Sequence, residues 1–271
     1  MSAAARKDRK LSDHLKALST AAILKRAEKV MGSIVRPLET HHSPLSELPP
    51  NPQSVEIDLE ETLESSPWSI ANADRVPPRP EDLWMEYQSV RDQSVILAVD
   101  TSLSMTGEKL ALTAVALAVV LLQFPEDRVG ILAFENEPRV LKRPSEKITV
   151  DEFVGRFLNV PAQGYTHLES GMRAAILLLR EASVAGSRRP PSTVLVTDGK
   201  YTAGKDPSYL AGRFPHLIVL KMGRERASLP LCEEIAKKGR GSLREVDDLD
   251  VLPAAMYDIV KDLLRGTPSR V

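Results

Sequence analysis

The alternation of short apolar runs with longer helical patterns begins at Ser94 and continues almost to the end of the chain. Strands that alternate with helices predict a doubly wound, Rossmann-like α/β domain with a mainly parallel sheet, here over residues 94–265 and followed by a tail at 266–271. We predict strands at 94–99, 128–134, 138–142, 193–197, 216–222 and 242–246, and helices at about 107–123, 149–158, 167–182, 206–212, 229–238 and 249–264.

Two features refine the prediction for the sheet and its first helix. The strand at 138–142 follows the preceding strand by a tight turn, so we expect it to pair antiparallel at an edge of the six-stranded sheet. The helix at 107–123 is apolar almost all round, which predicts burial on every side. Its apolar run from Leu110 to Leu122 is shorter than the roughly 18 residues that cross a bilayer, and we expect no membrane span.

The residues before the domain form two segments of opposite charge. Residues 1–36 contain nine Lys or Arg and three Asp or Glu, and their apolar positions recur at helical spacing, which predicts a basic amphipathic helical arm. Residues 37–93 begin with an acidic tract and are rich in proline, and within them only 55–63 is expected to order locally. We therefore expect 37–93 to be a linker or docking segment.

Composition and charge narrow the classes of function. The formal net charge of -1 over 271 residues offers no general attraction to nucleic acid or to an anionic membrane. Cys232 is the single cysteine, so no disulfide can form within one chain, and a reducing cytoplasm fits best. Neither G-x-G-x-x-G after the first strand nor G-x-x-x-x-G-K-[ST] occurs, which argues against a dinucleotide dehydrogenase and against intrinsic ATPase activity.

Hydroxyl and carboxylate side chains stand at the ends of the predicted strands and at the start of one helix. They are Asp100, Ser102, Ser104, Thr166 and Asp198. The first three follow the strand at 94–99, the fourth precedes the helix at 167–182, and the last follows the strand at 193–197. Open α/β sheets bind ligands beyond the carboxyl ends of their strands, and oxygen groups are the ligands that hard cations such as Mg²⁺ prefer. The sequence therefore predicts a divalent-metal site there.

This arrangement resembles the metal-ion-dependent adhesion site (MIDAS) of von Willebrand factor A domains. That pattern is D-x-S-x-S, then a distant threonine, then an aspartate that ends a later strand. The resemblance covers the whole predicted α/β domain and implies that Ser102 and Ser104 bind the ion directly. It implies contacts largely through water for Asp100 and Asp198, and for Thr166 a direct contact in some conformations only.

Two positions depart from the pattern of the family. Leu103 and Tyr165 stand where glycine is common among relatives. A side chain at such a place crowds the backbone, so these residues are expected to weaken metal binding or to reshape the surface that a partner meets.

The resemblance implies a binding module rather than an enzyme. One Mg²⁺, or Mn²⁺ or Ca²⁺ in its place, would keep much of its positive charge between neutral hydroxyls, and an open position would attract an Asp or Glu of a partner protein. The chain also resembles the CoxE-like and magnesium-chelatase-D-like proteins. That likeness implies a MoxR-type AAA+ ATPase, or its client, as the partner, and an adaptor or co-chaperone role.

Each element of the site also has a purely structural interpretation. Asp100 can simply end a strand, Asp198 can belong to an ordinary turn, and Thr166 with Glu169 can form a capping box for the following helix. With the same fold and no metal, the chain would be a scaffold.

The enzyme alternative is a Rossmann-like phosphohydrolase. A carboxylate after the first strand, here Asp100, can form an acyl phosphate as a nucleophile. Such enzymes commonly place a second aspartate two residues further on, where this chain has Ser102, and no general base is evident beside the loops.

Overall fold

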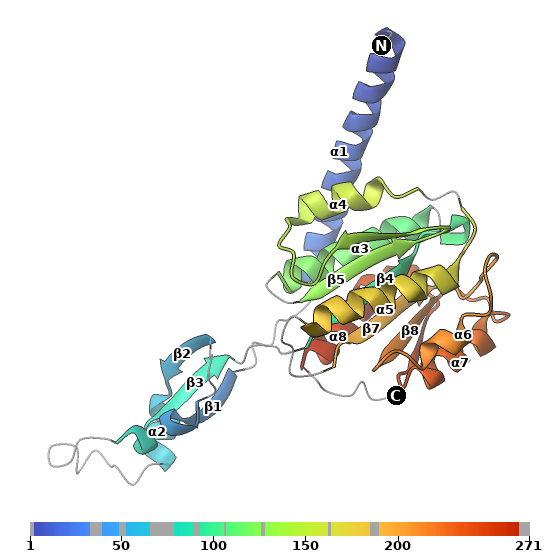
Figure 1. Cartoon of the computed structure of the whole chain (residues 1–271). Coiled ribbons are helices and arrows are strands. Elements are labelled where there is room, and N and C mark those ends of the chain that lie inside the picture. The colour runs from blue at the N-terminus through green and yellow to red at the C-terminus, as the bar shows by residue number, and fades with distance from the viewer. Residues whose placement is uncertain are drawn as a thin grey trace. The chain divides into compact units, whose positions relative to one another are not determined.

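The computed structural model (Figure 1) divides the chain into two compact units, Met1–Ile34 with Asp92–Val271, and Val35–Arg91. The larger unit contains an α/β domain and the N-terminal helix. The structure describes residues 3–32, 40–48, 53–65, 79–88, 93–105, 107–125, 128–161, 164–184 and 190–265.

The α/β domain is built on one six-stranded sheet, which confirms the predicted fold. Its strands, in order across the sheet, are β6 (Pro138–Lys142), β5 (Val129–Phe134), β4 (Val95–Asp100), β7 (Ser192–Thr197), β8 (Leu217–Met222) and β9 (Leu243–Val246). Neighbouring strands are parallel except at the edge, where β6 pairs antiparallel with β5, as predicted.

The central strands are buried on both faces, which explains their continuous apolar sequences. In β4, Val95, Leu97 and Val99 belong to one hydrophobic cluster, while Ile96 and Ala98 belong to the other. Successive side chains of a strand point to opposite faces, so a single strand contributes to both cores. The carboxyl end of β4 is thereby held rigidly at the centre of the sheet.

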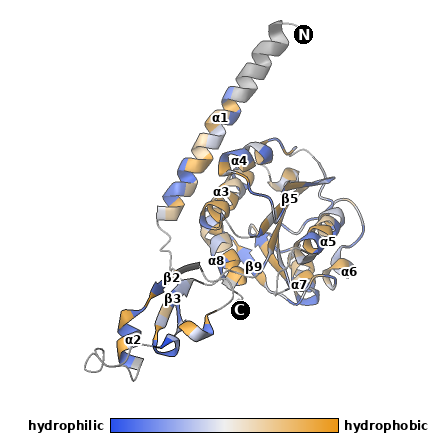
Figure 2. Ribbon diagram, turned by 60° about the vertical axis from the view of Figure 1, so that its left-hand side comes forward, coloured by the Kyte–Doolittle hydropathy of each residue, from blue (hydrophilic) through white to orange (hydrophobic). Residues whose placement is uncertain are grey.

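Helices cover both faces of the sheet and complete a three-layer fold (Figure 1). One face packs against α3 (Glu108–Gln123), α4 (Val150–Leu158) and α8 (Leu252–Arg265), and the other against α5 (Leu168–Val184), α6 (Ser208–Ala211) and α7 (Leu229–Lys238). The helix expected at 249–264 begins instead with the 3₁₀ turn η5 (Leu249–Val251) before α8. Most of α3 is buried, as its sequence predicts, and Figure 2 shows its hydrophobic character.

The N-terminal helix α1 (Ala3–Gly32) is part of the larger unit. Ile23 and Ala27 are buried in the cluster that also contains α3 and α8. At the edge of this contact, Arg26 Nη2 donates to Asp250 Oδ1 at 2.6 Å. The predicted helix is therefore present, and its second half packs against the helical layer that contains α3 and α8.

The smaller unit is a three-stranded antiparallel sheet, which corrects the expectation of a linker over residues 37–93. Prolines within this segment weighed against strands, but Pro44 ends one strand and Pro80 opens a 3₁₀ turn, positions where the missing N–H is tolerated. Trp84 N–H, in the middle strand, donates to Thr62 Oγ1 at 2.9 Å and connects this strand to the helix that contains Thr62. The elements are β1 (Thr40–Pro44), η1 (Leu45–Glu47), β2 (Gln53–Ile57), α2 (Leu59–Ser65), η3 (Pro80–Asp82) and β3 (Trp84–Gln88), in the strand order β1-β3-β2.

None of the helices in the described part of the chain combines the length and the apolar character that crossing a bilayer requires.

Candidate metal-binding site

The carboxyl ends of β4 and β7 lie side by side, and a side-chain hydrogen bond joins them. Val99 is in register with Val196 across the two strands. Thr197 Oγ1, from the last residue of β7, donates to Asp100 Oδ2, from the last residue of β4, at 2.8 Å. This contact fixes the two loops that follow the strands close to one another.

Asp100 is completely buried and accepts hydrogen bonds at both carboxylate oxygens. Besides the bond from Thr197, Ser102 N–H donates to Oδ1 at 2.9 Å. Burial raises the pKa of the Asp100 carboxyl to about 6 although the hydrogen bonds from Ser102 and Thr197 lower it, and the charge of Asp198 raises it further. Burial therefore makes the ionised form of Asp100 less favourable, and a cation nearby would stabilise that form.

Ser102 and Ser104 bring their hydroxyl groups together in the turn after β4. The two Oγ atoms lie 3.2 Å apart, and Ser104 lies in the 3₁₀ turn η4 (Leu103–Met105). Ligands at about 2.1 Å from an octahedral Mg²⁺ lie about 3 Å from their neighbours. The spacing of the hydroxyls is thus the spacing that two ligands of one small cation require.

Asp198 is buried, and its two carboxylate oxygens differ. Oδ1 accepts from Lys200 N–H at 3.2 Å. Oδ2 has no hydrogen-bond partner among the described residues, although Lys109 Nζ lies 3.8 Å from it. The same ammonium group donates to the Ser104 carbonyl at 3.2 Å, so a positive charge already lies between the two loops.

The N-terminal part of helix α7 packs against the turn at Asp198 and Gly199. Gly199 has φ +77°, and a Cβ at this position would lie 2.6 Å from Cys232 Sγ and 2.9 Å from Ser228. Ser228 Oγ donates to the Asp198 carbonyl at 2.6 Å. Burial raises the pKa of the Cys232 thiol to about 11, so this cysteine packs under the turn as a neutral group.

Thr166 is buried in the third loop, which touches both of the others through its backbone. Leu103 N–H donates to the Gly164 carbonyl at 3.4 Å. Thr166 N–H donates to Thr202 Oγ1, and Thr202 N–H donates back to the Thr166 carbonyl, both at 3.0 Å. Backbone contacts therefore place the Thr166 loop next to the Ser102 turn and to the segment after Asp198.

Several residues that position the site were missed in the sequence. Glu135 and Asn136 follow β5 and accept from Gly164 N–H and Tyr165 N–H at 2.7 and 3.0 Å. A Cβ at Gly164 would lie 2.6 Å from both side chains. The sequence could have indicated Thr197, because it adjoins Asp198. The roles of Lys109, Thr202 and Ser228 could not be predicted, because their contacts join residues far apart in the sequence.

The residues brought together fit a hard divalent cation. Hydrogen bonds and one ion pair connect these loops. Asp100, Ser102, Ser104 and Asp198 are joined directly or through Lys109 and Thr197, and Thr166 is joined through its backbone. Every candidate ligand offers oxygen, which suits Mg²⁺ or Mn²⁺ better than soft metals. Within the described ranges, no group of three or more His, Cys, Asp or Glu could hold a metal, so the candidate site depends on hydroxyl ligands.

The geometry weighs against two of the alternative interpretations. Asp100 is a poor nucleophile, since it is buried and both oxygens already accept hydrogen bonds. Glu169 does not behave as the partner of Thr166 in a capping box, because its carboxylate accepts from Lys205 N–H at 3.0 Å and from Arg173 at 2.9 Å, and also from Tyr209. It ties the loop after Asp198 to α5.

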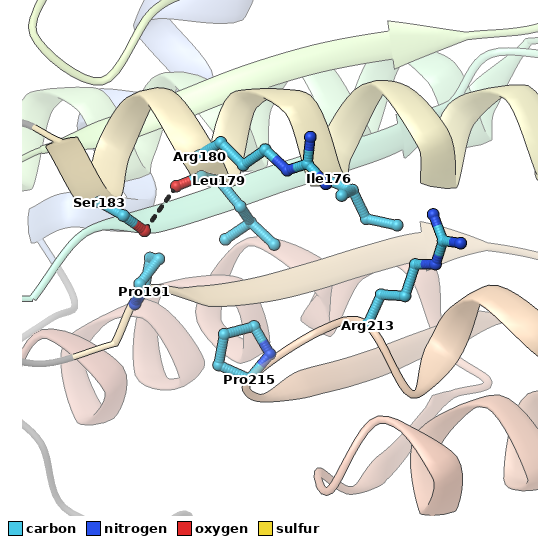
Figure 3. A pocket seen from close by; sticks show the side chains of 7 residues that line it. All are labelled: Ile176, Leu179, Arg180, Ser183, Pro191, Arg213 and Pro215. Atoms are coloured by element: carbon cyan, nitrogen blue, oxygen red, sulfur yellow. Dashed lines mark hydrogen bonds between the residues drawn. The ribbon is translucent and has the colours of Figure 1, made fainter.

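A separate cavity of ≈ 470 Å³ opens at the opposite, amino end of β7 (Figure 3). Arg180 and Arg213 extend along its rim, and Ser183 Oγ donates to the Leu179 carbonyl at 2.9 Å. It contains none of the five predicted site residues. Its lining consists of Ile176, Leu179, Arg180, Ser183, Pro191, Arg213 and Pro215.

Comparison with known proteins agrees with this fold. Residues 95–200 match the family model of the von Willebrand factor type A domain. The chain is 28% identical over 156 residues to inter-alpha-trypsin inhibitor heavy chain H4 of Sus scrofa, a match that covers 56% of this chain and only 16% of that protein.

Two solved structures share the fold. One is a von Willebrand factor type A protein from Catenulispora acidiphila, with a TM-score of 0.52 and 15% identity over 66% of this chain and 44% of that one. The other is proximal thread matrix protein 1 from the mussel byssus with a zinc-occupied MIDAS motif, with a TM-score of 0.50 and 16% identity over 63% of this chain and 47% of that one. Residues 95–200 are therefore similar to the von Willebrand factor type A domain, and the α/β domain shares its fold with these structures.

Proposed function

We propose that this chain is a metal-dependent protein-binding module. Ser102 and Ser104 bind one divalent cation directly, Asp100 and Asp198 hold it largely through water, and Thr166 joins it in some conformations. A cation held in this way supplies an open coordination position for a carboxylate of a partner protein.

The observation that carries the proposal is that Oδ2 of buried Asp198 accepts no hydrogen bond among the described residues. A buried carboxylate oxygen without a hydrogen-bond donor costs free energy, and Oδ2 of Asp198 is such an atom among the described residues. A divalent cation beside it would compensate this charge together with that of Asp100. Two buried carboxylates close to each other therefore support the proposal of a cation ligand.

The neutral hydroxyl groups favour a site that binds over a site that hydrolyses. Ser102 and Ser104 add no negative charge, so a bound ion would remain electron-poor and would attract an external anion. Asp100, the candidate nucleophile, is buried and both of its oxygens accept hydrogen bonds, which favours a binding role over hydrolysis. This combination agrees with the interaction role that is common among von Willebrand factor type A domains.

We further propose a MoxR-type AAA+ ATPase, or its client, as the partner, with this chain as a cytoplasmic adaptor or co-chaperone. The resemblance to CoxE-like and magnesium-chelatase-D-like proteins is the basis for this finer proposal. We propose helix α1 as a second contact surface; Lys25 and Lys29 are exposed on it, while Ile23 and Ala27 are buried against the domain.

Metal uptake and partner capture test the proposal together. The purified chain is titrated with Mg²⁺ and Mn²⁺, and proteins retained from a lysate are compared with and without EDTA. We expect uptake of one ion and EDTA-sensitive capture that includes an AAA+ ATPase.

The variant Asp198→Ala is expected to lose both properties, and Asp258→Ala, at an exposed position of α8, is the matched control. Failure of the wild-type chain to take up either ion would refute the metal site. If Asp198→Ala loses metal uptake but captures the partner as well as the wild-type chain does, the ion has no role in binding. EDTA-sensitive capture without an ATPase would refute only the named partner.

A further inference from the structure

Each of the three loops at the candidate metal site exposes one large apolar or aromatic side chain. Leu103, Tyr165 and Tyr201 have exposed fractions of 63%, 69% and 38%. We call these three residues the apolar rim. Exposed apolar side chains are common singly on protein surfaces, but a group of them gathered at one site indicates an interaction surface.

The backbone contacts that join the loops also bring the rim residues together. Leu103 N–H donates to the carbonyl of Gly164, the residue before Tyr165. Thr202, the residue after Tyr201, exchanges two hydrogen bonds of 3.0 Å with Thr166, the residue after Tyr165. Tyr165 therefore stands between the other two, next to the residues proposed as ligands.

The loop that carries Tyr165 is fixed in position. Tyr165 N–H donates to Asn136 Oδ1 at 3.0 Å, and Gly164 N–H donates to Glu135 Oε2 at 2.7 Å. A side chain on a fixed backbone loses less conformational entropy when a partner covers it. Tyrosine is also among the residues that most often dominate the energy of protein interfaces.

We infer that the apolar rim is the surface that selects the partner, and that the partner presents an Asp or Glu flanked by large apolar side chains. This inference rests on the proposed function, because the cation at the site takes the carboxylate. Lys109 Nζ lies between the Ser104 carbonyl and Asp198, and together with a bound divalent cation its charge outweighs the two carboxylates of Asp100 and Asp198, so the loaded site attracts an anion. The apolar flanks would cover the rim and exclude water from the carboxylate, which strengthens its attraction to positive charge.

An array of synthetic peptides with a central Asp and varied flanking residues tests the inference on the full-length chain in Mn²⁺. Burial of one or two large apolar side chains predicts that Leu, Ile or Phe flanks improve binding roughly tenfold or more over Ser or Gly flanks. Leu103→Ser and Tyr165→Ser should remove this preference and keep the Mn²⁺ affinity, because neither side chain is a proposed ligand. Leu177→Ser is the matched control, since Leu177 is similarly exposed, at 59%, on α5.

The outcomes separate this inference from the function on which it rests. Equal binding of apolar and polar flanks, with Mn²⁺ uptake intact, would overturn the rim as the selecting surface. A preference for phosphoserine over Asp at the centre would overturn the assignment of a carboxylate. Absence of Mn²⁺ uptake, read by calorimetry before any peptide is added, would overturn the proposed function, and the inference with it.

Discussion

The loops that end β4 and β7 each carry an aspartate at the carboxyl edge of the sheet, but the structure uses the two carboxylates differently. Asp100 is fully buried and accepts hydrogen bonds at both oxygens, from Ser102 N–H and from Thr197 Oγ1. Asp198 accepts from Lys200 N–H at one oxygen, and the other, among the described residues, accepts no hydrogen bond and lies 3.8 Å from the ammonium of Lys109. The Asp100 carboxylate joins the loops through hydrogen bonds, and the Asp198 carboxylate has one oxygen that accepts no hydrogen bond among the described residues.

This difference teaches that identical residues in a shared motif need not contribute equally. The Asp100 carboxylate lies within a network that fixes the β4 loop even without a ligand, and its burial opposes the charged form. Oδ2 of Asp198 accepts no hydrogen bond in the described structure, and its nearest charged group there is the ammonium of Lys109. Substitutions at the two positions should therefore separate stability from ligand binding.

The largest expected effect is on stability at Asp100. Its pKa is 3.8 when unperturbed and about 6 in the folded, metal-free chain, so the folded state binds the proton more tightly than the unfolded state. Between these values stability falls as pH rises, by about 3 kcal/mol in total at 1.36 kcal/mol per pKa unit. Asp100→Asn should abolish this loss and raise the free energy of unfolding above pH 6 in EDTA.

Urea denaturation in EDTA at several pH values measures this effect, with Asp258→Asn on the exposed side of α8 as the control. Parallel pH profiles for the wild-type chain and Asp100→Asn would contradict the assignment. Added Mg²⁺ should reverse the order of stability, because a bound cation stabilises the ionised Asp100 of the wild-type chain.

A second effect is expected on metal affinity at Asp198. Outer contacts of a metal site typically change affinity 10- to 100-fold, and Asp198→Asn should reach about 100-fold because it removes the charge of the unpaired oxygen. Calorimetric titration with Mn²⁺ measures the affinity. Asp206→Asn is the control, since Asp206 is an exposed aspartate that accepts from Ser208 N–H beyond the same loop. Equal losses of Mn²⁺ affinity in Asp198→Asn and Asp206→Asn would contradict a specific role of Asp198 at the metal site.

The link between the two loops can be cut at Thr197. Its hydroxyl donates to Asp100 Oδ2 and accepts from Gly199 N–H, so Thr197→Val leaves two buried groups unpaired and should lower the free energy of unfolding by about 2 kcal/mol. Thr193→Val is an isosteric control on the same strand, since Thr193 Oγ1 is buried without a hydrogen-bond partner in the described structure. Thermal or urea denaturation should show little loss for this control. Equal destabilisation of both would mean that the hydroxyl of Thr197 is not special.

The smallest expected effect concerns Lys109. Its ammonium compensates Asp198 in the metal-free chain and would repel a cation bound beside it, so Lys109→Met should tighten Mn²⁺ binding about tenfold. Lys237→Met, at an exposed position of α7, controls for the general change in charge. Weaker Mn²⁺ binding in Lys109→Met would show instead that this lysine supports the site.

The fold was predictable because its signals are local, and the proximity of some candidate site residues was predictable for the same reason. Continuous apolar runs identified β4, β7 and β8, and the order of strands and helices led to the parallel sheet with β6 at its edge. Asp100, Ser102 and Ser104 lie within one turn, so their spacing alone brings them together. The contribution of Thr202 was not predictable, since its contacts with Thr166 depend on how two loops meet in space.

The smaller unit shows where reasoning from composition failed. Acidic residues and prolines in 37–93 favour an unstructured segment, yet β3 pairs with β1 and β2 on either side. The partners of β3 lie far before it in the chain, and only long-range pairing reveals strands with such weak individual patterns. Pairing information across the sequence, rather than propensity, was the missing signal.

Helix α1 has a practical consequence for any dissection of the molecule. Its Ile23 and Ala27 seal one side of the layer formed by α3 and α8, although they precede the sheet by more than sixty residues in the numbering. A fragment cut at Asp92 would leave that apolar layer bare to water, and bare apolar surface promotes self-association. Aggregation of such a truncated chain would therefore result from the loss of α1 as a cover of the hydrophobic core. It would not be evidence that the full-length chain forms oligomers.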